Sequence, residues 1–365
     1  MRILFLSNAA SIHTVRWVNA LSERGHEVHL VYKFDDEPKE NKINESVYQH
    51  KLKYSGTKGY FLNAFQLKNL MKKINPDVVN AHYASGYGTL ARIAKMKPLV
   101  LSVWGSDVYE FPYQSIFKMK LVVDNLKYAD KIASTSPNMA DQVKRLVKKT
   151  DIDITITPFG INLEQFRPLK TKMTSQITIG NIKSLKKIYG LDYLIKAMSI
   201  LNSNLELSNN SELINQIKLH IYGDGPEKDN LNALVKELSL ENTVIFKGSI
   251  PNKEVPKALE SFDIFCASST HESFGVSLIE AMSMKLPVIA TNVPGFIEIV
   301  DDNITGILVE NRNSIEIAKA LEILITNKNL RLSMGEKGRI KVEDNFDWNK
   351  NVDSMLELYK TLKGN

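Results

Sequence analysis

The chain has 365 residues, of which 43% are hydrophobic and 24% are charged. These proportions are typical of a globular protein and exclude a disordered or fibrous chain. At roughly 150 residues per domain, the length predicts about two domains, each with its own core. The single cysteine, Cys266, excludes an internal disulfide bond and a cysteine-cluster metal site, and it fits a cytoplasmic location.

The net charge of +6 is distributed unevenly along the chain. Residues 1–170 contain 25 Lys and Arg against 16 Asp and Glu, a balance of +9, whereas residues 171–365 contain 22 against 25, a balance of −3. The positive charge therefore belongs to the first half. Such an excess suits anionic lipid head groups, a phosphorylated substrate or nucleic acid, and the alternative is a solvated lysine-rich surface.

No stretch approaches the roughly 18 consecutive apolar residues that a membrane span needs, so the chain is predicted not to cross a bilayer. Met1 and Arg2 lead directly into a short apolar run, without the successive regions of a secretion signal. We therefore expect a cytoplasmic protein whose basic half can also contact the inner face of the plasma membrane.

Short apolar runs alternate with amphipathic helical stretches along the whole chain, which predicts an α/β fold of parallel strands covered by helices on both faces. The strands predicted in the first half are residues 3–6, 28–31, 78–81, 99–103, 131–134 and 154–157, and the helices are 14–23, 61–73, 88–94 and 137–147. We expect one sheet of about six strands.

A second series of strands follows the polar stretch 169–172. Its members are predicted at residues 176–180, 218–222, 243–246, 264–267, 288–290 and 306–309. The two series predict two doubly wound domains that join near residue 168, with a ligand outside the carboxyl ends of the strands. Segment 202–215 is asparagine-rich and predicts a surface insertion, and the apolar spacing of 348–362 predicts a terminal helix.

Segment 271–282 carries the most informative motif. Glu272 precedes a helix predicted to start near Phe274 or Gly275, and Glu280 follows eight residues later in its second turn. A helix start at the carboxyl end of a strand binds anions, because its first N–H groups have no helical partner. Glu280 projects from the apolar face, where a carboxylate needs a hydroxyl partner. Either glutamate alone would be an ordinary helix charge, but the pair is more specific.

Two further motifs follow predicted strands. Lys183, Lys186 and Lys187 lie in one loop, where fixed cations would stabilise an anionic group, and a surface role is the alternative for each lysine. Segment 222–226, Tyr-Gly-Asp-Gly-Pro, is a strand-to-helix turn whose glycines permit positive φ angles and close backbone approach.

These motifs resemble those of retaining GT-B glycosyltransferases of family four. The two glutamates match the E-x7-E motif of that family, and segment 286–309 continues in its order. The family usually has an arginine and a lysine in the loop after Gly180, and we match them to Lys183 and Lys187. The resemblance covers nearly the whole chain and is strongest over residues 176–310.

The resemblance implies a role for each matching residue. Glu280 would hold the nucleotide ribose hydroxyls, Glu272 would contact the transferred sugar, and Lys183 and Lys187 would stabilise the leaving diphosphate. The remaining donor-binding positions implied are Asn181, Gly223, Ser273, Phe274, Gly275 and Val276.

The fold implied is GT-B, with two Rossmann-like domains facing a central cleft. Residues 1–168 would form the acceptor-binding domain and residues 169–346 the nucleotide-sugar-binding domain. Residues 347–365 would form a helix that packs back on the first domain.

The reaction implied is a retaining, metal-independent transfer of a sugar from a nucleoside-diphosphate sugar, expected to be a UDP-sugar, without a cofactor. The acceptor would be a glycan or a lipid-linked glycan of bacterial-type surface polysaccharide synthesis. Segment 117–131 places lysines beside apolar residues, which favours contact with an anionic membrane. Asp151 and Asp153 form a D-x-D pattern, but no third ligand stands near, so we predict no metal site.

The first domain matches the family less closely. Trp104 stands where the family has the histidine of its H-G-x-D motif, so the polar contact with the sugar would pass to Asp107 or His82. Either residue is alternatively a structural polar group. Ser11 and His13 would reach the acceptor or a phosphate, or else serve as a helix cap and a partly buried ring.

Three other functions remain as alternatives. A non-hydrolysing sugar-nucleotide epimerase shares the GT-B fold but lacks the combined motifs. A non-catalytic nucleotide-sugar binding protein would keep Glu280 and lose the contacts with the reacting sugar. Nucleic-acid binding is supported by charge alone, and we expect none.

Overall fold

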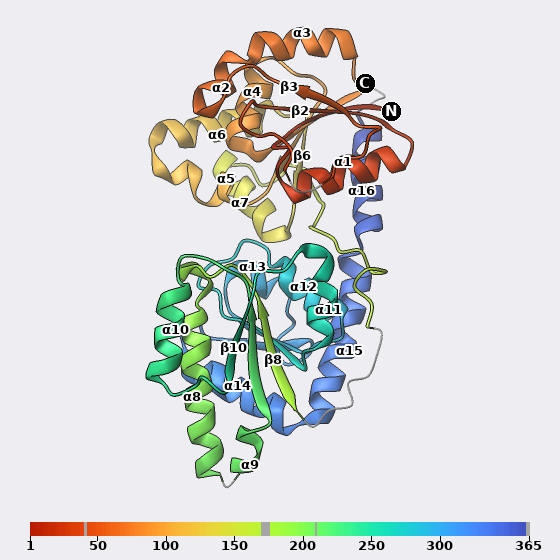
Figure 1. The fold of residues 1–365 in the computed structure, drawn as a ribbon. Coiled ribbons are helices and arrows are strands. Elements are labelled where there is room, and N and C mark those ends of the chain that lie inside the picture. The colour runs from red at the N-terminus through yellow and green to blue at the C-terminus, as the bar shows by residue number, and fades with distance from the viewer. Residues whose placement is uncertain (40–41, 169–175, 209, 363–365) are drawn as a thin grey trace. The chain divides into compact units, whose positions relative to one another are not determined.

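The computed structural model describes residues 1–39, 42–168, 176–208 and 210–362. The chain forms two compact units (Figure 1): unit 1 is Met1–Phe159 with Asn349–Asn365, and unit 2 is Gly160–Trp348. The division thus falls at Phe159 rather than near residue 168. The polar stretch 169–172, the predicted linker, lies outside the described residues.

Unit 1 contains a parallel sheet, as predicted. Within its described residues the strand order is β3-β2-β1-β4-β5-β6-β7. The strands are β1 (Arg2–Leu6), β2 (Glu27–Tyr32), β3 (Tyr48–Lys51), β4 (Val78–His82), β5 (Leu99–Val103), β6 (Lys131–Ser134) and β7 (Ile154–Ile156). The central strands are buried on both faces, which is why they are continuous apolar runs in the sequence.

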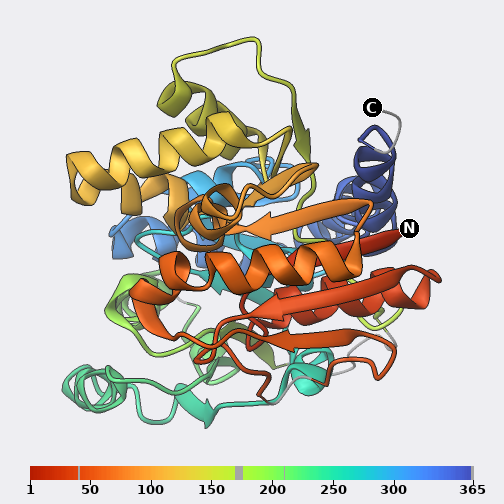
Figure 2. The ribbon, with the colours of Figure 1, turned by 90° about the horizontal axis from the view of Figure 1, so that it is seen from above.

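The helices of unit 1 cover both faces of this sheet. They are α1 (Ile12–Glu23), α2 (Gly56–Leu62), α3 (Ala64–Ile74), α4 (Gly88–Ile93), α5 (Ser106–Tyr109), α6 (Ile116–Tyr128), α7 (Pro137–Val147) and α16 (Trp348–Lys360), with a π-helix at Tyr83–Tyr87 and a 3-10 helix at Phe111–Gln114. Helices α1 and α3 lie on opposite faces (Figure 2). Helix α1 belongs to the crossover from β1 to β2, and α3 belongs to the crossover from β3 to β4. These crossovers run in opposite directions across the sheet, and because both are right-handed their helices fall on opposite faces.

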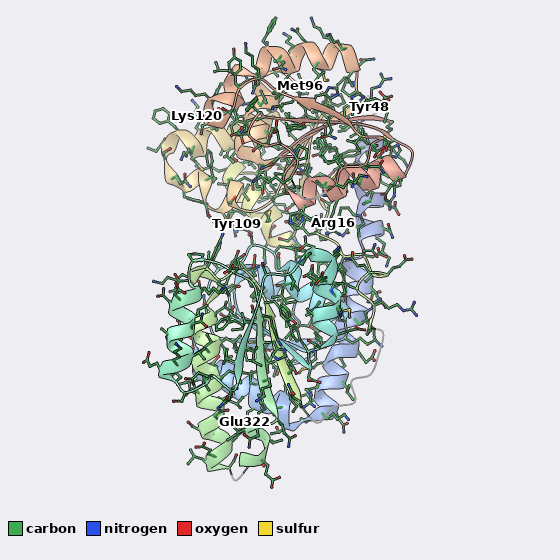
Figure 3. All side chains as sticks on the ribbon, viewed as in Figure 1. Arg16, Tyr48, Met96, Tyr109, Lys120 and Glu322 are labelled. Atoms are coloured by element: carbon green, nitrogen blue, oxygen red, sulfur yellow. The ribbon has the colours of Figure 1, made fainter. Side chains whose placement is uncertain are left out.

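The seventh strand, β3, is missing from the predicted set. Its sequence Tyr-Gln-His-Lys has no apolar run, because β3 is the outer strand beside β2 and its side chains are mostly exposed. Tyr48 is 57% exposed at this edge (Figure 3). A strand that buries little apolar surface carries no hydrophobic periodicity to predict it.

Helix α16 packs against the sheet of unit 1 through a polar contact in an apolar surrounding. Asn80 of β4 donates from Nδ2 to the Tyr359 hydroxyl at 2.8 Å, and Ser102 of β5 donates to Asn80 Oδ1 at 3.1 Å. Asn80, Ser102 and Tyr359 are all buried. The helix therefore shares the core of unit 1 although it ends the chain.

Unit 2 contains a second parallel sheet, again as predicted. The strand order in its described part is β10-β9-β8-β11-β12-β13. The strands are β8 (Ile177–Ile182), β9 (Ile217–Tyr222), β10 (Val244–Gly248), β11 (Ile264–Ala267), β12 (Val288–Thr291) and β13 (Gly306–Val309).

Helices α8 and α10 lie on one side of this sheet and α11 and α12 on the other (Figure 1). The helices are α8 (Leu191–Leu207), α9 (Ser211–Ile214), α10 (Lys228–Glu237), α11 (Val255–Glu260), α12 (Val276–Ser283), α13 (Pro294–Ile297), α14 (Ser314–Thr326) and α15 (Lys328–Asn345), with 3-10 helices at Lys187–Tyr189 and Asn252–Glu254. The expected surface insertion 202–215 is wrong in its first part: α8 continues to Leu207 because Leu205 is fully buried in the core.

Among the described residues, no helix combines the length and the apolar composition that crossing a bilayer requires.

The contact between Asn80 and Tyr359 predicts how much α16 contributes to the stability of unit 1. Tyr359→Phe removes the hydroxyl acceptor of the buried Asn80 amide and leaves it the weaker Met355 sulfur at 3.8 Å, so we expect the free energy of unfolding to fall by about 1–3 kcal/mol. Urea denaturation followed by circular dichroism measures the change. Tyr48→Phe, at an exposed position, is the matched control and should change stability by less than about 0.5 kcal/mol. Equal losses in both variants would contradict the buried contact.

Candidate functional site

The sheet of unit 2 reverses its winding between β8 and β11. The chain runs from β8 outward through β9 to β10, and then returns to β11 on the other side of β8. In a doubly wound sheet, the loops after two such strands diverge and leave a crevice at their carboxyl ends, where ligands bind. Both predicted donor motifs follow these two strands.

An ion pair joins the two loops. Lys183 Nζ, after β8, lies 2.6 Å from Glu272 Oε2, after β11. The two side chains are 23% and 16% exposed, so the pair is largely shielded from water. Lys183 Nζ also lies 4.5 Å from the centroid of the Tyr189 ring, a cation–π distance. The structure thus brings together two residues that the sequence predicted to act on the same substrate.

The path of the lysine loop depends on two glycines of the turn after β9. A Cβ on Gly223 would lie 1.9 Å from the Lys183 carbonyl oxygen, and a Cβ on Gly225 would lie 2.5 Å from that of Leu185. Gly223 also has φ +143°, a conformation that other residues rarely adopt. Gly223 therefore supports the backbone of Lys183, and direct contact with the donor stays a prediction.

The end of the lysine loop is held by the loop after β11. Ser268 Oγ donates to the Tyr189 carbonyl at 3.1 Å, and Thr270 Oγ1 donates to the Ile188 carbonyl at 3.0 Å. Gly190 has φ +58°, and a Cβ there would lie 2.2 Å from the Ser268 carbonyl oxygen. These contacts fix the loops after β8 and β11 relative to each other before any ligand arrives.

The loop that carries Glu272 is shaped by close backbone packing at the start of α12. Gly295 donates its N–H to the Glu272 carbonyl at 3.0 Å, and a Cβ on Gly295 would lie 2.4 Å from the Phe274 nitrogen. Gly275, with φ +98°, leads into α12, which begins at Val276. The helix therefore starts where the sequence predicted it, and anion binding by the N–H groups of its first turn stays a prediction.

The other predicted residues of this segment lie along the same helix start. Glu280 is half-buried in the second turn of α12, next to the buried Ile279 and Ala281. Phe274 is buried and its ring packs edge-on against Phe346, with 6.0 Å between the centroids, so it anchors the loop. Ser273 is half-buried, and its contact with the donor stays a prediction.

Asn181 lies inside the sheet. It is 4% exposed, and its Nδ2 donates to the Cys266 carbonyl of β11 at 2.7 Å. Its buried Oδ1 has no hydrogen-bond partner among the described residues. Asn181 therefore connects β8 to β11 two residues before Lys183. Its contact with the donor stays a prediction.

Lys187 lines a cavity of about 540 Å³ at the same edge of the sheet. The lining residues are Lys186, Lys187, Ile188, Leu191, Asp192, Tyr193, Glu227, Leu231, Thr270 and Arg312. In the part of the chain that the structure describes, Lys186, Lys187 and Arg312 form no salt bridge. Arg312 was not among the predicted site residues, although its place after the predicted strand 306–309 could have indicated it.

In unit 1 the residues predicted near the sugar are deeply buried. Asp107 is 1% exposed, and its carboxylate accepts hydrogen bonds from the N–H groups of Ala84, Trp104 and Gly105 at 2.6–3.1 Å. Burial raises the pKa of Asp107, and these three donors oppose the rise. The geometry matches the alternative that Asp107 is a structural polar group, because its carboxylate anchors the loops after β4 and β5. Contact of Asp107 with the sugar stays a prediction.

His82 is also buried and packs among aromatic rings. Its Nδ1 lies 3.1 Å from Ser7 Oγ, and its ring centroid lies 4.1 Å from that of Trp104. Burial lowers the pKa of His82 from 6.5 to about 3. A neutral, enclosed ring is an element of the packing at the carboxyl ends of β1 and β4, and its contact with the sugar stays a prediction.

The loop after β1 places His13 in the same aromatic cluster. The ring of His13 stacks on Phe159 at 4.2 Å and meets Trp104 edge-on at 5.7 Å. Burial lowers the pKa of His13 from 6.5 to about 4. Ser11 occupies the N-cap position of α1 without a side-chain cap hydrogen bond.

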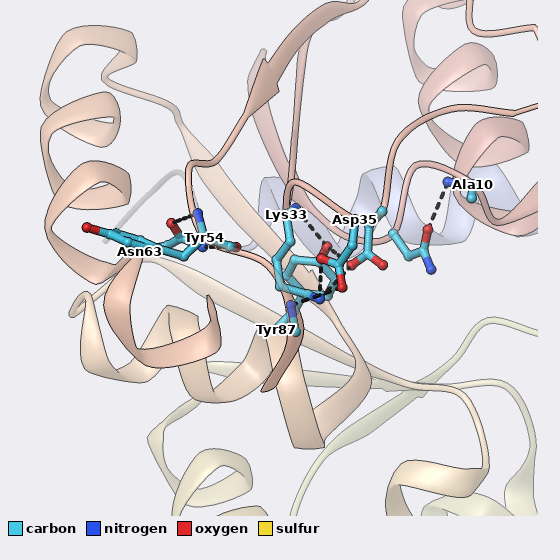
Figure 4. Close-up of polar contacts among 9 residues, drawn as sticks. Ala10, Lys33, Asp35, Tyr54, Asn63 and Tyr87 are labelled. Carbon is cyan, nitrogen blue, oxygen red and sulfur yellow. Dashed lines mark hydrogen bonds and ion pairs between the residues drawn. The ribbon is translucent and has the colours of Figure 1, made fainter. Parts of the chain in front are cut away.

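A buried polar network after β2 was not predicted (Figure 4). Lys33, 3% exposed, lies 2.9 Å from Asp35 and 3.4 Å from Asp36, and the Tyr87 hydroxyl donates to Asp36 at 2.5 Å. Burial disfavours the ammonium charge, but the hydrogen bond to Asp35 and the nearby carboxylates raise the pKa of Lys33. The sequence Lys-Phe-Asp-Asp directly after a strand was the available signal.

The fold is similar to that of solved structures of sugar-nucleotide proteins. The HepE protein of Anabaena, solved with UDP-glucose, matches 99% of this chain and 100% of that chain with a TM-score of 0.79 and 17% sequence identity. The two sheets and this likeness define a protein of the GT-B fold. The chain belongs to the glycosyltransferases: residues 162–341 match the family Glycosyl transferases group 1, and residues 2–136 match Glycosyl transferase 4-like.

Two relatives illustrate the range of this family. N-acetyl-alpha-D-glucosaminyl L-malate synthase of Bacillus anthracis is 25% identical over 358 residues, which cover 93% of this chain and 90% of that protein. Poly(ribitol-phosphate) alpha-N-acetylglucosaminyltransferase of Staphylococcus aureus is 32% identical over 148 residues, which cover 40% of this chain and 30% of that protein. Their names give acceptors as different as malate and a polymer.

The close approach of Gly223 to the lysine loop predicts an intolerant position. Gly223→Ala must displace the Lys183 carbonyl, so we expect the free energy of unfolding to fall by about 2 kcal/mol or more. Gly248→Ala is the matched control: Gly248 also has a positive φ, +74°, but open space around it, so the loss should be about 1 kcal/mol. Urea denaturation of the full chain separates the two. A smaller loss for Gly223→Ala than for the control would contradict the packing.

The two buried histidines predict how stability depends on pH. Because their folded-state pKa values lie below 6.5, the native state binds fewer protons than the unfolded state between about pH 6.5 and 4. The free energy of unfolding should therefore fall as the pH is lowered through this window. His82→Gln should reduce the slope of the free energy of unfolding against pH by the equivalent of about one bound proton. Urea denaturation at several pH values measures this slope. An unchanged slope in this variant would show that His82 does not contribute.

Proposed function

We propose that unit 2 binds a nucleoside-diphosphate sugar, a UDP-sugar, at the edge between β8 and β11. The chain would transfer the sugar with retention of configuration and without a metal ion. The observation that carries the proposal is the ion pair between Lys183 and Glu272, which places a cation and a carboxylate in contact at the carboxyl ends of these strands. The HepE structure with UDP-glucose supports the choice of donor.

In the proposed complex, Lys183 exchanges its carboxylate partner for an oxygen of the diphosphate. Glu272 is then released to accept hydrogen bonds from hydroxyls of the transferred sugar. A fixed ammonium beside a diphosphate stabilises the negative charge that builds up as the sugar departs. Lys187, with Lys186 and Arg312 around the adjoining cavity, adds positive charge at the same edge.

Glu280 and the start of α12 hold the rest of the donor. The half-buried carboxylate of Glu280 accepts hydrogen bonds from the ribose hydroxyls, which are neutral donors of the kind that a carboxylate on this face can bind. The first N–H groups of α12, from Gly275 and Val276 onward, face the diphosphate. No metal is needed, since lysines and helix N–H groups provide the countercharge.

The proposed reaction needs no side chain as a base. The bond between the anomeric carbon and the diphosphate oxygen breaks, and the acceptor oxygen bonds to the same face of that carbon. The acceptor proton passes to the departing phosphate oxygen, so atoms and charge balance. The buried His82 and Asp107 then act by shaping the edge of unit 1, the proposed acceptor domain.

We propose a glycan or a lipid-linked glycan as the acceptor, in the synthesis of a bacterial-type surface polysaccharide. The relative that acts on poly(ribitol-phosphate) supports a polymeric acceptor, and the +9 charge of residues 1–170 suits an anionic one. The reaction would take place on the cytoplasmic side, where the unpaired Cys266 fits a reducing compartment. Peripheral contact with the membrane would bring the enzyme to a lipid-linked substrate.

Donor binding is tested by thermal unfolding with a panel of nucleotides and nucleotide sugars, with and without EDTA. A donor at 100 times its Kd adds about 2.7 kcal/mol, so the Tm of the wild type should rise by several degrees with or without EDTA. Lys183→Ala and Glu280→Ala should each lose this shift. Lys319→Ala, at an exposed position of α14 in the same unit, should retain it. No shift with any nucleotide would overturn the proposed site.

Product analysis then distinguishes the reactions. Transfer to an acceptor with the anomeric configuration of the donor supports the proposal, and NMR of the product determines that configuration. A donor sugar that changes without any acceptor would identify an epimerase, and binding without transfer or hydrolysis would identify a binding protein.

A further inference from the structure

Helices α2 and α3 of unit 1 present large apolar side chains to solvent. Phe65 is 76% exposed, Leu62 is 54% exposed and Phe61 is 48% exposed. They lie within two helical turns around the junction of the two helices, so they form one outward patch. Contiguous exposed apolar side chains of this size mark a surface that binds a partner.

The inner face of these helices already packs in the core of unit 1, so the exposed residues are additional to that core. Gly59, Asn63, Leu67 and Ile74 are buried at helical spacing. Asn63 fixes the junction (Figure 4): its Oδ1 accepts from the Tyr54 N–H at 3.0 Å, and its Nδ2 donates to the Tyr54 carbonyl at 2.8 Å. These hydrogen bonds therefore hold the junction of α2 and α3 that carries the outward patch.

Positive charge surrounds this patch. Between Glu45 and Asp77 the sequence contains six lysines and no acidic residue. The lysines are Lys51, Lys53, Lys58, Lys68, Lys72 and Lys73. Lys51 forms an ion pair with Glu37, whereas the other five form no salt bridge among the described residues. We name Phe61, Leu62 and Phe65 with Lys58, Lys68, Lys72 and Lys73 the α2–α3 surface.

Helix α6 carries a second cluster of exposed apolar side chains, and the charges around the two clusters distinguish them. Ile116 and Phe117 are 87% and 88% exposed, but acidic residues stand near this helix. Lys131 pairs with Asp153 at 3.0 Å, Lys97 pairs with Asp130 at 2.6 Å, and Asp124 lies within α6 itself. Three of the four lysines in segment 117–131, which the sequence favoured, form no salt bridge among the described residues, but Asp124 and Asp130 offset part of its positive charge. Residues 46–76, which carry the α2–α3 surface, contain no acidic residue.

We propose that the α2–α3 surface docks on an anionic lipid bilayer. Phe61, Leu62 and Phe65 enter the boundary between head groups and acyl chains, and the unpaired lysines contact lipid phosphates and carboxylates. The combination fits a bilayer because the lysines are spread around apolar side chains. Lys73 also lines a cavity of about 410 Å³ with Lys51, whereas Lys58, Lys68 and Lys72 do not line this cavity. The inference specifies the membrane contact of the proposed function but needs no nucleotide sugar, so it can fail independently.

Vesicle flotation of the full chain tests the proposal. Vesicles of phosphatidylcholine alone and of equal parts phosphatidylcholine and phosphatidylglycerol are compared, and only the anionic ones should recruit the wild type, less so at high salt. The double variants Leu62→Ser with Phe65→Ser and Lys68→Glu with Lys72→Glu should each bind roughly tenfold less or weaker still. The matched control, Phe117→Ser with Lys120→Glu in α6, should retain binding.

Four outcomes would overturn the proposal. They are absence of recruitment, equal recruitment to neutral vesicles, loss only in the α6 variant, and a dimer in gel filtration that Leu62→Ser with Phe65→Ser disperses. Tight binding to single-stranded RNA without recruitment to vesicles would likewise replace a bilayer with nucleic acid as the partner. The donor-induced rise in Tm, measured on the same variants, should be unchanged, so failure of the surface and failure of the donor site are distinguishable.

Discussion

The chemistry of unit 2 depends on one constraint, the parallel pairing of β8 with β11. Because parallel strands end at the same edge, Lys183 and Glu272, 89 residues apart in the sequence, meet at 2.6 Å. Gly223 and Gly225 support the first loop by close backbone contact, and Gly295 supports the second. The ion pair is therefore already assembled in the protein alone. If the proposed donor binds here, Lys183 has only to exchange Glu272 for the diphosphate, without a large rearrangement.

Unit 1 uses the equivalent edge in a different way. The Asp107 carboxylate accepts hydrogen bonds from three backbone N–H groups, and the His82 ring is enclosed between Ser7 and Trp104. Buried polar groups paired in this way stabilise loops but cannot easily reach a substrate. Trp104 contributes to this arrangement, because its ring packs against His13, His82, Tyr83 and Phe159. This edge of unit 1 is aromatic, with His13 beside Trp104 and Phe159.

Most of the fold was predictable because buried parallel strands are continuous apolar runs. The edge strand β3 was missed since its side chains face solvent, and α8 continues through polar residues 202–207 because one face of it still packs in the core. At the site, the pair Glu272 and Glu280 was recognisable from its spacing. The bond between Lys183 and Glu272 and the hydrogen bond from Asn181 to Cys266 were not, because each joins segments far apart in the sequence. For Arg312 the available signal was its place after a predicted strand.

The sequence by itself determined the fold class and the family, and it pointed to the segments of the candidate site, because hydrophobic periodicity and motif spacing are local properties of the chain. Only the tertiary structure decided which charges are paired and which remain open to a ligand. Lys183 and Lys187 are similar in the sequence, yet the first lies against Glu272 and the second lines a cavity. Likewise, Lys68 and Lys131 differ only in their neighbours, and the second has Asp153 within 3.0 Å. The physical reason is that the free energy of a charge is set by what surrounds it in space, and parallel crossovers bring those surroundings from distant parts of the chain.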